Sequence, residues 1–363
     1  MARQGLSLRL PSIVAAVSAM GGAHAQVRSA AELSIGLRVD NQTPATVRTA
    51  IADGSLIKTY GPRGTVHLLP REELPLWCAA LGAAPAGSSL PAGARLDANQ
   101  TAAVLDAIRD ALSPGEPLDA DELGEVILRR LGDWAADPVV PAFGGWWPRW
   151  RQAIALAASR GILAFGDNRG SRVTFVNPGV VPEADITRAL GWLLRQYLST
   201  YGPATPAGYG RWLGVRGAWA AAQFARFEAE LETVTVEGQT AVVNRGDTAP
   251  PETRTRAITL LPHFDPYVIG SFPRERLFPG AAATRALGRG QAGVHPVLLI
   301  DGVVAGVWNA KRRTGGLVVT VEPIVRLTKM QVVTLDREVE RLGQFFDAST
   351  ELSLGVVSTG AHK

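Results

Sequence analysis

The fold prediction starts from residues 43–69, TPATVRTAIADGSLIKTYGPRGTVHLL. The Thr-Pro pair at the start is a favourable N-cap with proline at the first helical position, and Gly54 is a typical helix end. Residues 55–60 and 65–69 have strand-like composition and flank a Gly-Pro-Arg-Gly turn. The stretch therefore predicts a helix followed directly by a two-stranded hairpin.

The same order of elements recurs twice further along the chain. At least two predicted helices precede each hairpin; before the second hairpin they span 97–112 and 120–131. The later copies are a helix from Trp147 to Arg160 with strands 162–165 and 172–176, and a helix over 218–229 with strands 231–236 and 240–243. Helices followed by a hairpin form the winged-helix arrangement, in which one helix enters a DNA groove and the hairpin touches the backbone. Three copies favour nucleic-acid binding, although tandem winged helices also serve as protein-interaction modules.

The last third of the chain has a different pattern. Residues 247–256 are rich in Pro, Thr and Arg and predict a linker. Beyond it, strands are predicted over 257–261, 294–300, 303–308 and 317–321, with Asp301-Gly302 as a hairpin turn and a helix over 328–346. The predicted class is therefore α+β. The expected domains are three tandem winged-helix units over 1–90, 91–180 and 181–246, and a C-terminal antiparallel β-subdomain with a closing helix over 247–363.

The composition is globular and mildly basic. The 363 residues carry a net charge of +4, almost all of the positive charge being arginine, which suits phosphate contacts. The single cysteine, Cys78, lies in an apolar helical context, so we expect no disulfide and no catalytic thiol. The histidines and carboxylates lack compact ligand spacing, so we expect no metal and no other cofactor. Gly288, Gly290 and Gly293 have dinucleotide-binding spacing but precede a predicted strand, which favours a loop.

Residues 1–26 allow two interpretations. Two arginines, the apolar run over 13–20 and small residues up to Ala25 follow the pattern of a secretory signal, whose cleavage would remove His24. The apolar run is weak, however, and fits equally well a buried helix that precedes a second helix over 28–38. We favour this cytoplasmic interpretation. No stretch approaches the ~20 apolar residues of a membrane span, so no membrane partner is expected.

Three stretches taken together resemble the AlkZ-type winged-helix DNA glycosylases of bacteria, including the YcaQ-like branch. They are Gly22-Ala23-His24-Ala25-Gln26-Val27 with a helix ending at Arg38, then Arg63-Gly64-Thr65-Val66-His67-Leu68, and then Leu260-Leu261-Pro262-His263-Phe264-Asp265-Pro266-Tyr267 with residues 296–302 and 307–308 downstream. The ordered set spans nearly the whole chain, and this order makes the resemblance specific.

The resemblance implies a C-shaped monomer that cradles double-stranded DNA containing alkylated purines. Family members hydrolyse the N-glycosidic bond of N7-alkylguanine, and some unhook interstrand crosslinks, in base excision repair or in self-resistance to genotoxins. Lys58 is the only lysine in the three predicted units. We therefore expect a monofunctional glycosylase that leaves an abasic site, without lysine-based lyase chemistry.

The family's catalytic pair, Gln-x-Gln or Gln-x-Asp, falls here on His24 and Gln26, so the first position departs from the pattern. The Gln26 amide can orient a water, and His24 can hold that water or accept its proton. In an extended segment the two side chains point the same way, whereas on a helix they diverge by roughly 200°. The departure fits an altered lesion preference. It also fits the alternative of a catalytically inactive winged-helix DNA-binding or regulatory protein.

Other residues are expected to contact DNA or to support the site. The expected DNA contacts are Arg63 and Thr65 at the first hairpin, Lys311, Arg312 and Arg313 at a later hairpin tip, and Arg274 and Arg276. His67 and Asp265 are expected to lie next to the catalytic pair and to hold it in position without contacting the substrate. We expect Trp146, Trp147 and Trp150 to pack in the core of a helical segment rather than to stack on bases.

Overall fold

The computed structural model describes residues 1–85, 87, 90–113, 115–142, 144–249, 257–288 and 290–358. The first unit packs short helices around a three-stranded sheet with strand order β1-β3-β2. Its elements are α1 (Ile13–Ala19), β1 (Ala23–His24), α2 (Arg28–Gly36), α3 (Pro44–Ala52), β2 (Leu56–Tyr60), β3 (Val66–Pro70) and α4 (Leu74–Ala83). Thr43 caps α3 through a reciprocal pair of hydrogen bonds with Thr46, as the Thr-Pro start predicts. The predicted helix and hairpin are both present.

Helix α1 belongs to the core of the first unit. Ala16 and Val17 are fully buried, in the same apolar cluster as Leu56 and Leu68 of the hairpin. Residues 13–19 therefore form the buried helix that one of the two interpretations of the N-terminus requires. Within the part of the chain that the structure describes, no helix has the length and apolar character needed to cross a bilayer.

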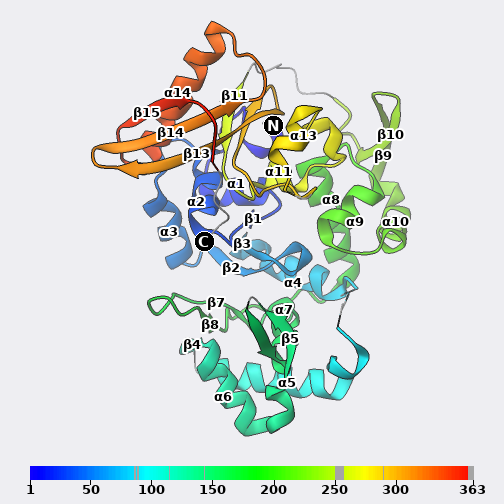
Figure 1. Cartoon of the computed structure of the whole chain (residues 1–363). Helices are drawn as coiled ribbons and strands as arrows, with labels where there is room; N and C mark the ends of the chain where they lie inside the picture. The colour runs from blue at the N-terminus through cyan, green and yellow to red at the C-terminus, as the bar shows by residue number, and fades with distance from the viewer. Residues whose placement is uncertain are drawn as a thin grey trace.

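The second unit lies in the lower part of the molecule in Figure 1. Its elements are α5 (Ala98–Leu112), β4 (Leu118–Asp119), α6 (Ala120–Leu131), β5 (Pro138–Ala142), β6 (Gly145–Pro148), α7 (Ile154–Ser159), β7 (Ala164–Phe165) and β8 (Thr174–Val176). One sheet has the order β4-β8-β7, and β5 pairs with β6 in a separate ribbon.

The predicted helix from Trp147 to Arg160 is wrong at its start. Residues 145–148 form strand β6, a 3₁₀ helix follows over Arg149–Ala153, and only then does α7 begin. Pro148 accounts for this, because the residue before a proline is driven out of the helical region. The expected burial is correct for Trp150, which is 3% exposed, but wrong for Trp146 and Trp147, which are 63% and 44% exposed.

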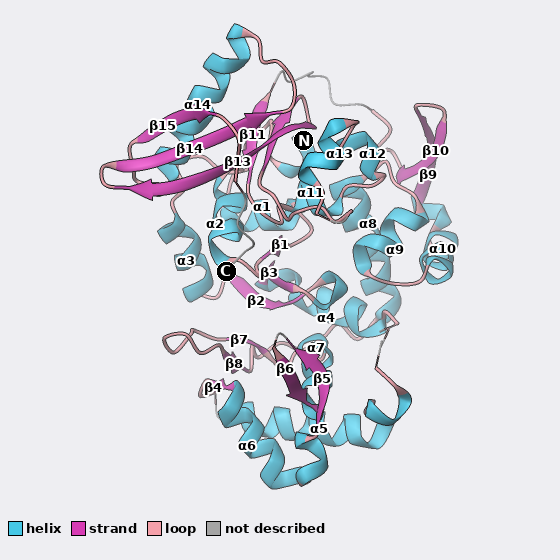
Figure 2. Ribbon diagram, in the orientation of Figure 1, coloured by secondary structure: helices cyan, strands magenta, loops and turns pink. Residues whose placement is uncertain are grey.

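The third unit agrees closely with the sequence prediction. Its elements are α8 (Ile186–Tyr201), α9 (Pro206–Leu213), α10 (Gly217–Arg226), β9 (Leu231–Val236) and β10 (Gln239–Asn244). Helix α4 of the first unit shares an apolar core with α8 and α9, so the first and third units are packed together. Figure 2 shows the three hairpins, β2–β3, β7–β8 and β9–β10, each after its helices.

The C-terminal part is a five-stranded sheet with the order β11-β12-β13-β14-β15, covered by a long helix. Its elements are β11 (Ile258–Leu261), α11 (Pro266–Gly270), α12 (Arg274–Leu277), α13 (Ala281–Ala286), β12 (Val297–Ile300), β13 (Val303–Arg313), β14 (Gly316–Pro323), α14 (Lys329–Phe346) and β15 (Thr350–Leu354). The expectation of a purely antiparallel sheet is wrong, because β15 pairs in parallel with β14. Most of the predicted linker, residues 250–256, lies outside the described residues.

Candidate active site

Two histidines face each other where β1 pairs with β3. His24 lies opposite His67 in the antiparallel register, and their ring centroids are 5.2 Å apart at an interplanar angle of 73°. Both side chains are buried, with His24 only 7% exposed. Gly61 makes room for this pair, because a Cβ at that position would lie 2.7 Å from the His67 ring. The structure thus brings the predicted catalytic histidine and its predicted supporting histidine together.

Phe264 covers the other side of His24, from the loop between β11 and α11. The two ring centroids are 5.0 Å apart. Phe264 has a φ of +57°, an unusual value for an aromatic residue, and its neighbour Asp265 is fully buried. Gly293 packs directly on Phe264, where a Cβ would lie 3.3 Å from the Phe264 Cα. The segment around Gly293 follows helix α13 and leads into strand β12, which is the reverse of a dinucleotide-binding turn.

Asp265 is held by a buried arginine rather than pointing into the site. Its two carboxylate oxygens accept hydrogen bonds of 2.8 and 2.9 Å from Arg38 at the end of α2, and both side chains are inaccessible to solvent. Asp265 also accepts a 3.0 Å hydrogen bond from the Tyr267 backbone, which caps α11. Asp265 therefore fixes the loop that carries Phe264 against the end of helix α2, which follows His24 and Gln26 in the chain. The sequence prediction did not include Arg38 among the site residues, because α2 also carries Arg28 and Glu32 and its pattern does not mark this arginine as buried.

The electrostatics of the site keep both histidines neutral near pH 7. Burial, together with the positive charge of Arg63, lowers the pKa of His24 to about 4. Burial lowers the pKa of His67 to about 3, with His24 and Arg63 contributing, although the contact with the Thr65 carbonyl opposes the shift. His67 Nδ1 lies 2.9 Å from that carbonyl oxygen, so Nδ1 is the protonated nitrogen and Nε2 is an acceptor. His24 Nδ1 is buried and has no hydrogen-bond partner among the described residues.

Gln26 is placed differently from His24. Residues 23–24 form strand β1, and the Ala25 amide continues the pairing by donating to the Val66 carbonyl, so the segment is extended rather than helical at its start. Gln26 itself lies in a bend before α2 and is exposed to solvent. The side chains of the predicted pair therefore occupy different environments: the histidine lies in the interior, and the glutamine lies at the surface.

The chain matches the family model described as DNA glycosylase AlkZ-like over residues 17–345. The chain belongs to the AlkZ-like DNA glycosylase family. It is 30% identical over 334 residues to the interstrand DNA cross-link repair glycosylase of Streptomyces sahachiroi, covering 85% of each protein. The solved structure of Streptomyces sahachiroi DNA glycosylase AlkZ superposes with a TM-score of 0.78 at 28% identity, covering 98% of this chain and 97% of the other. These matches confirm the resemblance predicted from the sequence and the α+β class.

Arg63 of this AlkZ-like chain makes a contact within the protein. It adopts a left-handed conformation with φ of +62°, and its guanidinium donates a 2.6 Å hydrogen bond to the Trp212 carbonyl of α9. The Thr65 hydroxyl donates a 3.0 Å hydrogen bond to the Pro62 carbonyl. The tip of the β2–β3 hairpin is thus docked on the third unit. There it lines a cavity of about 690 Å³ together with residues of α4 and α7.

The other basic residues expected to contact DNA fall into two groups in the AlkZ-like fold. Arg274 donates hydrogen bonds of 2.6 and 3.0 Å to carbonyl groups of α11, and Arg276 pairs with Glu237 at 3.0 Å, so both join parts of the protein. Lys311, Arg312 and Arg313 are exposed at the tip of the β13–β14 hairpin and form no ion pair with the described residues. The cations of this hairpin tip are therefore available to a ligand. Among the described residues, no group of three or more His, Cys, Asp or Glu is arranged to hold a metal ion.

The buried histidines predict a specific pH dependence of stability in this AlkZ-like chain. Because the pKa values of His24 and His67 lie at about 4 and about 3 in the folded protein, the unfolded chain binds protons at pH 5 to 6.5 that the native state does not bind. The free energy of unfolding is therefore expected to be highest above pH 6.5 and to fall as the pH drops. The slope is up to about 1.4 kcal/mol per pH unit for each histidine.

Urea denaturation between pH 7.5 and 5 measures this slope. The His24→Gln variant lacks one of the two titrating rings, so its stability is expected to change less steeply with pH than that of the native protein. Equal slopes for the two proteins would show that the native His24 is accessible to protons.

Proposed function

We propose that the chain is a monofunctional DNA glycosylase that hydrolyses the N-glycosidic bond of N7-alkylated guanine in double-stranded DNA. The observation that carries the proposal is the buried His24 with an unpaired ring nitrogen, two residues before the exposed Gln26. The sequence resemblance implies that these two residues stand at the family's catalytic pair. The Streptomyces sahachiroi relative is named for repair of interstrand crosslinks. We extend the proposal to bulky or crosslinking N7 adducts, in base excision repair or self-resistance.

The site is suited to a reaction whose transition state is cationic. N7-alkylguanine already carries a positive charge, so it leaves without protonation when the bond from C1′ to the purine nitrogen breaks. The bonding electrons go to the base and neutralise it, and positive charge moves onto the sugar. A protonated histidine would repel this charge, whereas the low pKa of His24 keeps the ring neutral.

The remaining step is the attack of water on C1′. A neutral imidazole nitrogen accepts a hydrogen bond from the water and orients its lone pair toward the sugar. The Gln26 amide, which both donates and accepts, holds the same water from the solvent side. The water proton passes along these hydrogen bonds to bulk solvent, because a histidine with a pKa of about 4 retains a proton poorly at pH 7.

The order of the helices and hairpins along the chain supports a proposal about how the protein holds DNA. We assign the units 1–90, 91–180 and 181–246 as three winged helices that form a C-shaped monomer around the duplex. The order of helices before each of the hairpins β2–β3, β7–β8 and β9–β10 supports this assignment. The exposed cations of the β13–β14 tip are suited to phosphate contacts.

A single-turnover assay on a duplex carrying one N7-methylguanine tests the function. We expect release of the free base and an abasic site, with strand cleavage only after alkali treatment, because the proposed reaction is hydrolytic. Strand cleavage without alkali would contradict the monofunctional assignment. A duplex carrying a bulky N7 adduct is the second substrate.

One observation favours the alternative of a catalytically inactive DNA-binding protein: His24 is buried, whereas Gln26 is exposed. Binding of both duplexes without base release from either would establish that alternative.

A further inference from the structure

The ribbon formed by β5 and β6 exposes two tryptophans. Trp146 is 63% and Trp147 is 44% exposed, although tryptophan is normally among the more buried residue types. The two strands form a sheet by themselves, and Trp146 lies opposite Pro141 in the register. Figure 2 shows the ribbon on the visible face of the second unit, beside α7. An isolated ribbon with large aromatic side chains at its surface is suited to contact another molecule.

A cation lies against one of the two tryptophans. The Arg151 guanidinium lies 4.7 Å from the centroid of the Trp147 ring, and the described residues of the ribbon carry no charged side chain. The nearby carboxylate of Asp137 is already paired with Arg149 at 2.9 Å. An aromatic surface with a cation behind it is complementary to a nucleobase and its adjacent phosphate.

This surface adjoins the first unit on the side of the candidate active site. Burial raises the pKa of Tyr60 at the end of β2 and the nearby charge of Arg151 opposes this rise, so the two side chains lie close together. The next residue, Gly61, packs on the ring of His67, which in turn contacts His24. Lys58 of the same strand lies over the Phe165 ring at 5.1 Å, so the strand connects the second unit to the site.

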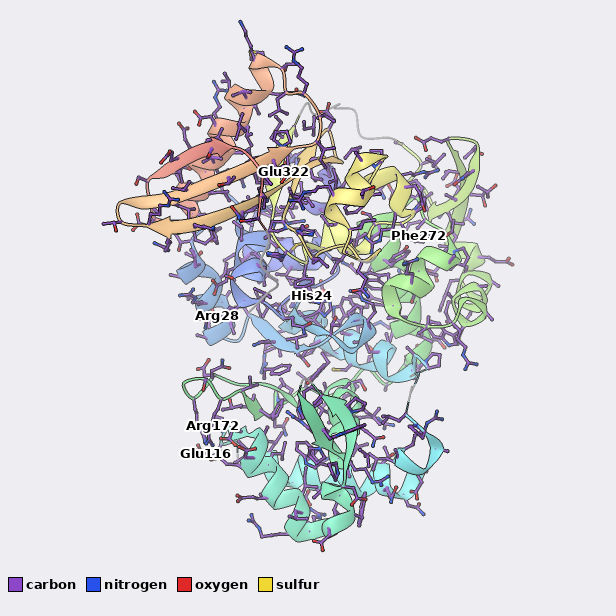
Figure 3. The ribbon with its side chains drawn as sticks, viewed as in Figure 1. His24, Arg28, Glu116, Arg172, Phe272 and Glu322 are labelled. Carbon is purple, nitrogen blue, oxygen red and sulfur yellow. The ribbon has the colours of Figure 1, made fainter. Side chains whose placement is uncertain are left out.

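A second cation continues this face toward the catalytic motif. Burial lowers the pKa of Lys58, and the charge of Arg28, the first residue of α2, lowers it further, so the two cations lie near each other. Figure 3 labels Arg28 on the side of the first unit that faces the second unit, with His24 deeper in the molecule. Positive charge is therefore present from the start of α2 to the β5–β6 ribbon.

We propose that the β5–β6 ribbon is a DNA contact, in which Trp146 stacks on a nucleobase and Arg151 faces a backbone phosphate of the same duplex. The proposal rests on the proposed function, because it assumes that DNA occupies the His24 site. A two-stranded ribbon fits a DNA groove, and an indole that wedges between two base steps there stacks on a base face regardless of sequence. The contact therefore contributes affinity rather than sequence preference.

Binding of a fluorescein-labelled 21-base-pair duplex by the full chain, followed by fluorescence anisotropy, tests the proposal. Trp146→Ala is expected to raise the dissociation constant about tenfold, which is the scale of one base–aromatic stack. Trp146→Phe keeps an aromatic face and is expected to stay within about threefold of the native protein. Met330→Ala is the matched control, since Met330 is 72% exposed on α14 and lies outside the proposed surface.

The possible results separate this inference from the function on which it rests. Weaker binding by Trp146→Ala, with Trp146→Phe and Met330→Ala close to native, supports the ribbon as a DNA contact. Native-like binding by Trp146→Ala, in a protein that releases N7-methylguanine, overturns the ribbon contact and leaves the glycosylase proposal in place. If the native protein neither binds the labelled duplex nor releases a base from the duplexes of the glycosylase assay, both the ribbon contact and the proposed function are overturned. Equal losses in Trp146→Ala and Met330→Ala also overturn the ribbon contact, because they reflect a general loss of surface contacts.

Discussion

The Gln26→Ala variant is expected to release N7-methylguanine about 100-fold more slowly than the native protein under single-turnover conditions, which is the scale of losing control over a reacting water. Gln26 is exposed in a bend, so removal of its amide leaves the packing of β1 and α2 intact. The rate should therefore fall while the melting temperature and the affinity for the duplex stay unchanged. The measurement is the single-turnover rate with enzyme in large excess over DNA.

Two further variants measure how much His24 contributes to the rate of base release. His24→Ala is expected to lower the same rate at least tenfold, because the neutral imidazole acceptor is lost. His24→Gln recreates the family's Gln-x-Gln pair and should retain activity within about tenfold of native. Gln344→Ala, an exposed glutamine on α14, is the matched control and should behave as native. Native-like rates for both Gln26→Ala and His24→Ala would remove the pair from the reaction and assign the hydrolysis to other residues of this chain.

The elements of the fold were predictable wherever local sequence and packing agree. Helix α14 begins after a Thr328 cap that is reciprocated by Gln331, and its predicted and observed bounds agree within a residue. Strand β9 also has its predicted bounds, because the Glu-Gly turn that follows it is a strong local signal. In the second unit, Pro148 and the preceding glycines override the helical spacing of the tryptophans and leave two of them at the surface. Strand β15 was missed because its short sequence, TELSL, shows its role only when it pairs with β14.

The candidate site was predictable only in part, because its residues meet through the tertiary structure. The motif around His24 and the stretch from Arg63 to Leu68 were recognised, but the direct opposition of His24 and His67 follows from the register of β1 and β3. Arg38 and Asp265 are separated by 227 positions, and no local pattern joins them. The burial that lowers the pKa of His24 comes from segments that are far apart in the sequence. The intrinsic pKa of histidine therefore gave no indication of how strongly the folded protein resists protonation of this ring.

The second large effect is expected at the buried pair of Arg38 and Asp265. Asp265→Asn leaves the Arg38 guanidinium charged and without a carboxylate in a site that solvent does not reach. Removing one partner of such a pair destabilises a protein by about 3–5 kcal/mol, because the remaining charge stays desolvated. Urea denaturation followed by circular dichroism measures the loss. Glu125→Gln is the control: it removes one partner of an exposed pair with Arg129, whose side chains are 74% and 69% exposed, and is expected to change stability little.

The same variant links stability to activity, because Asp265 fixes the loop in which Phe264 covers His24. At a temperature where Asp265→Asn remains folded, base release is expected to slow, since the ring that helps bury His24 is no longer held in place. The pH profile separates this effect from simple unfolding: as His24 becomes more solvated, its pKa rises toward 6.5, and activity should begin to decline at a higher pH than in the native protein. A stability loss with an unchanged pH profile would restrict the ion pair to a role in folding. A shifted profile would identify the ion pair as the contact that keeps His24 neutral.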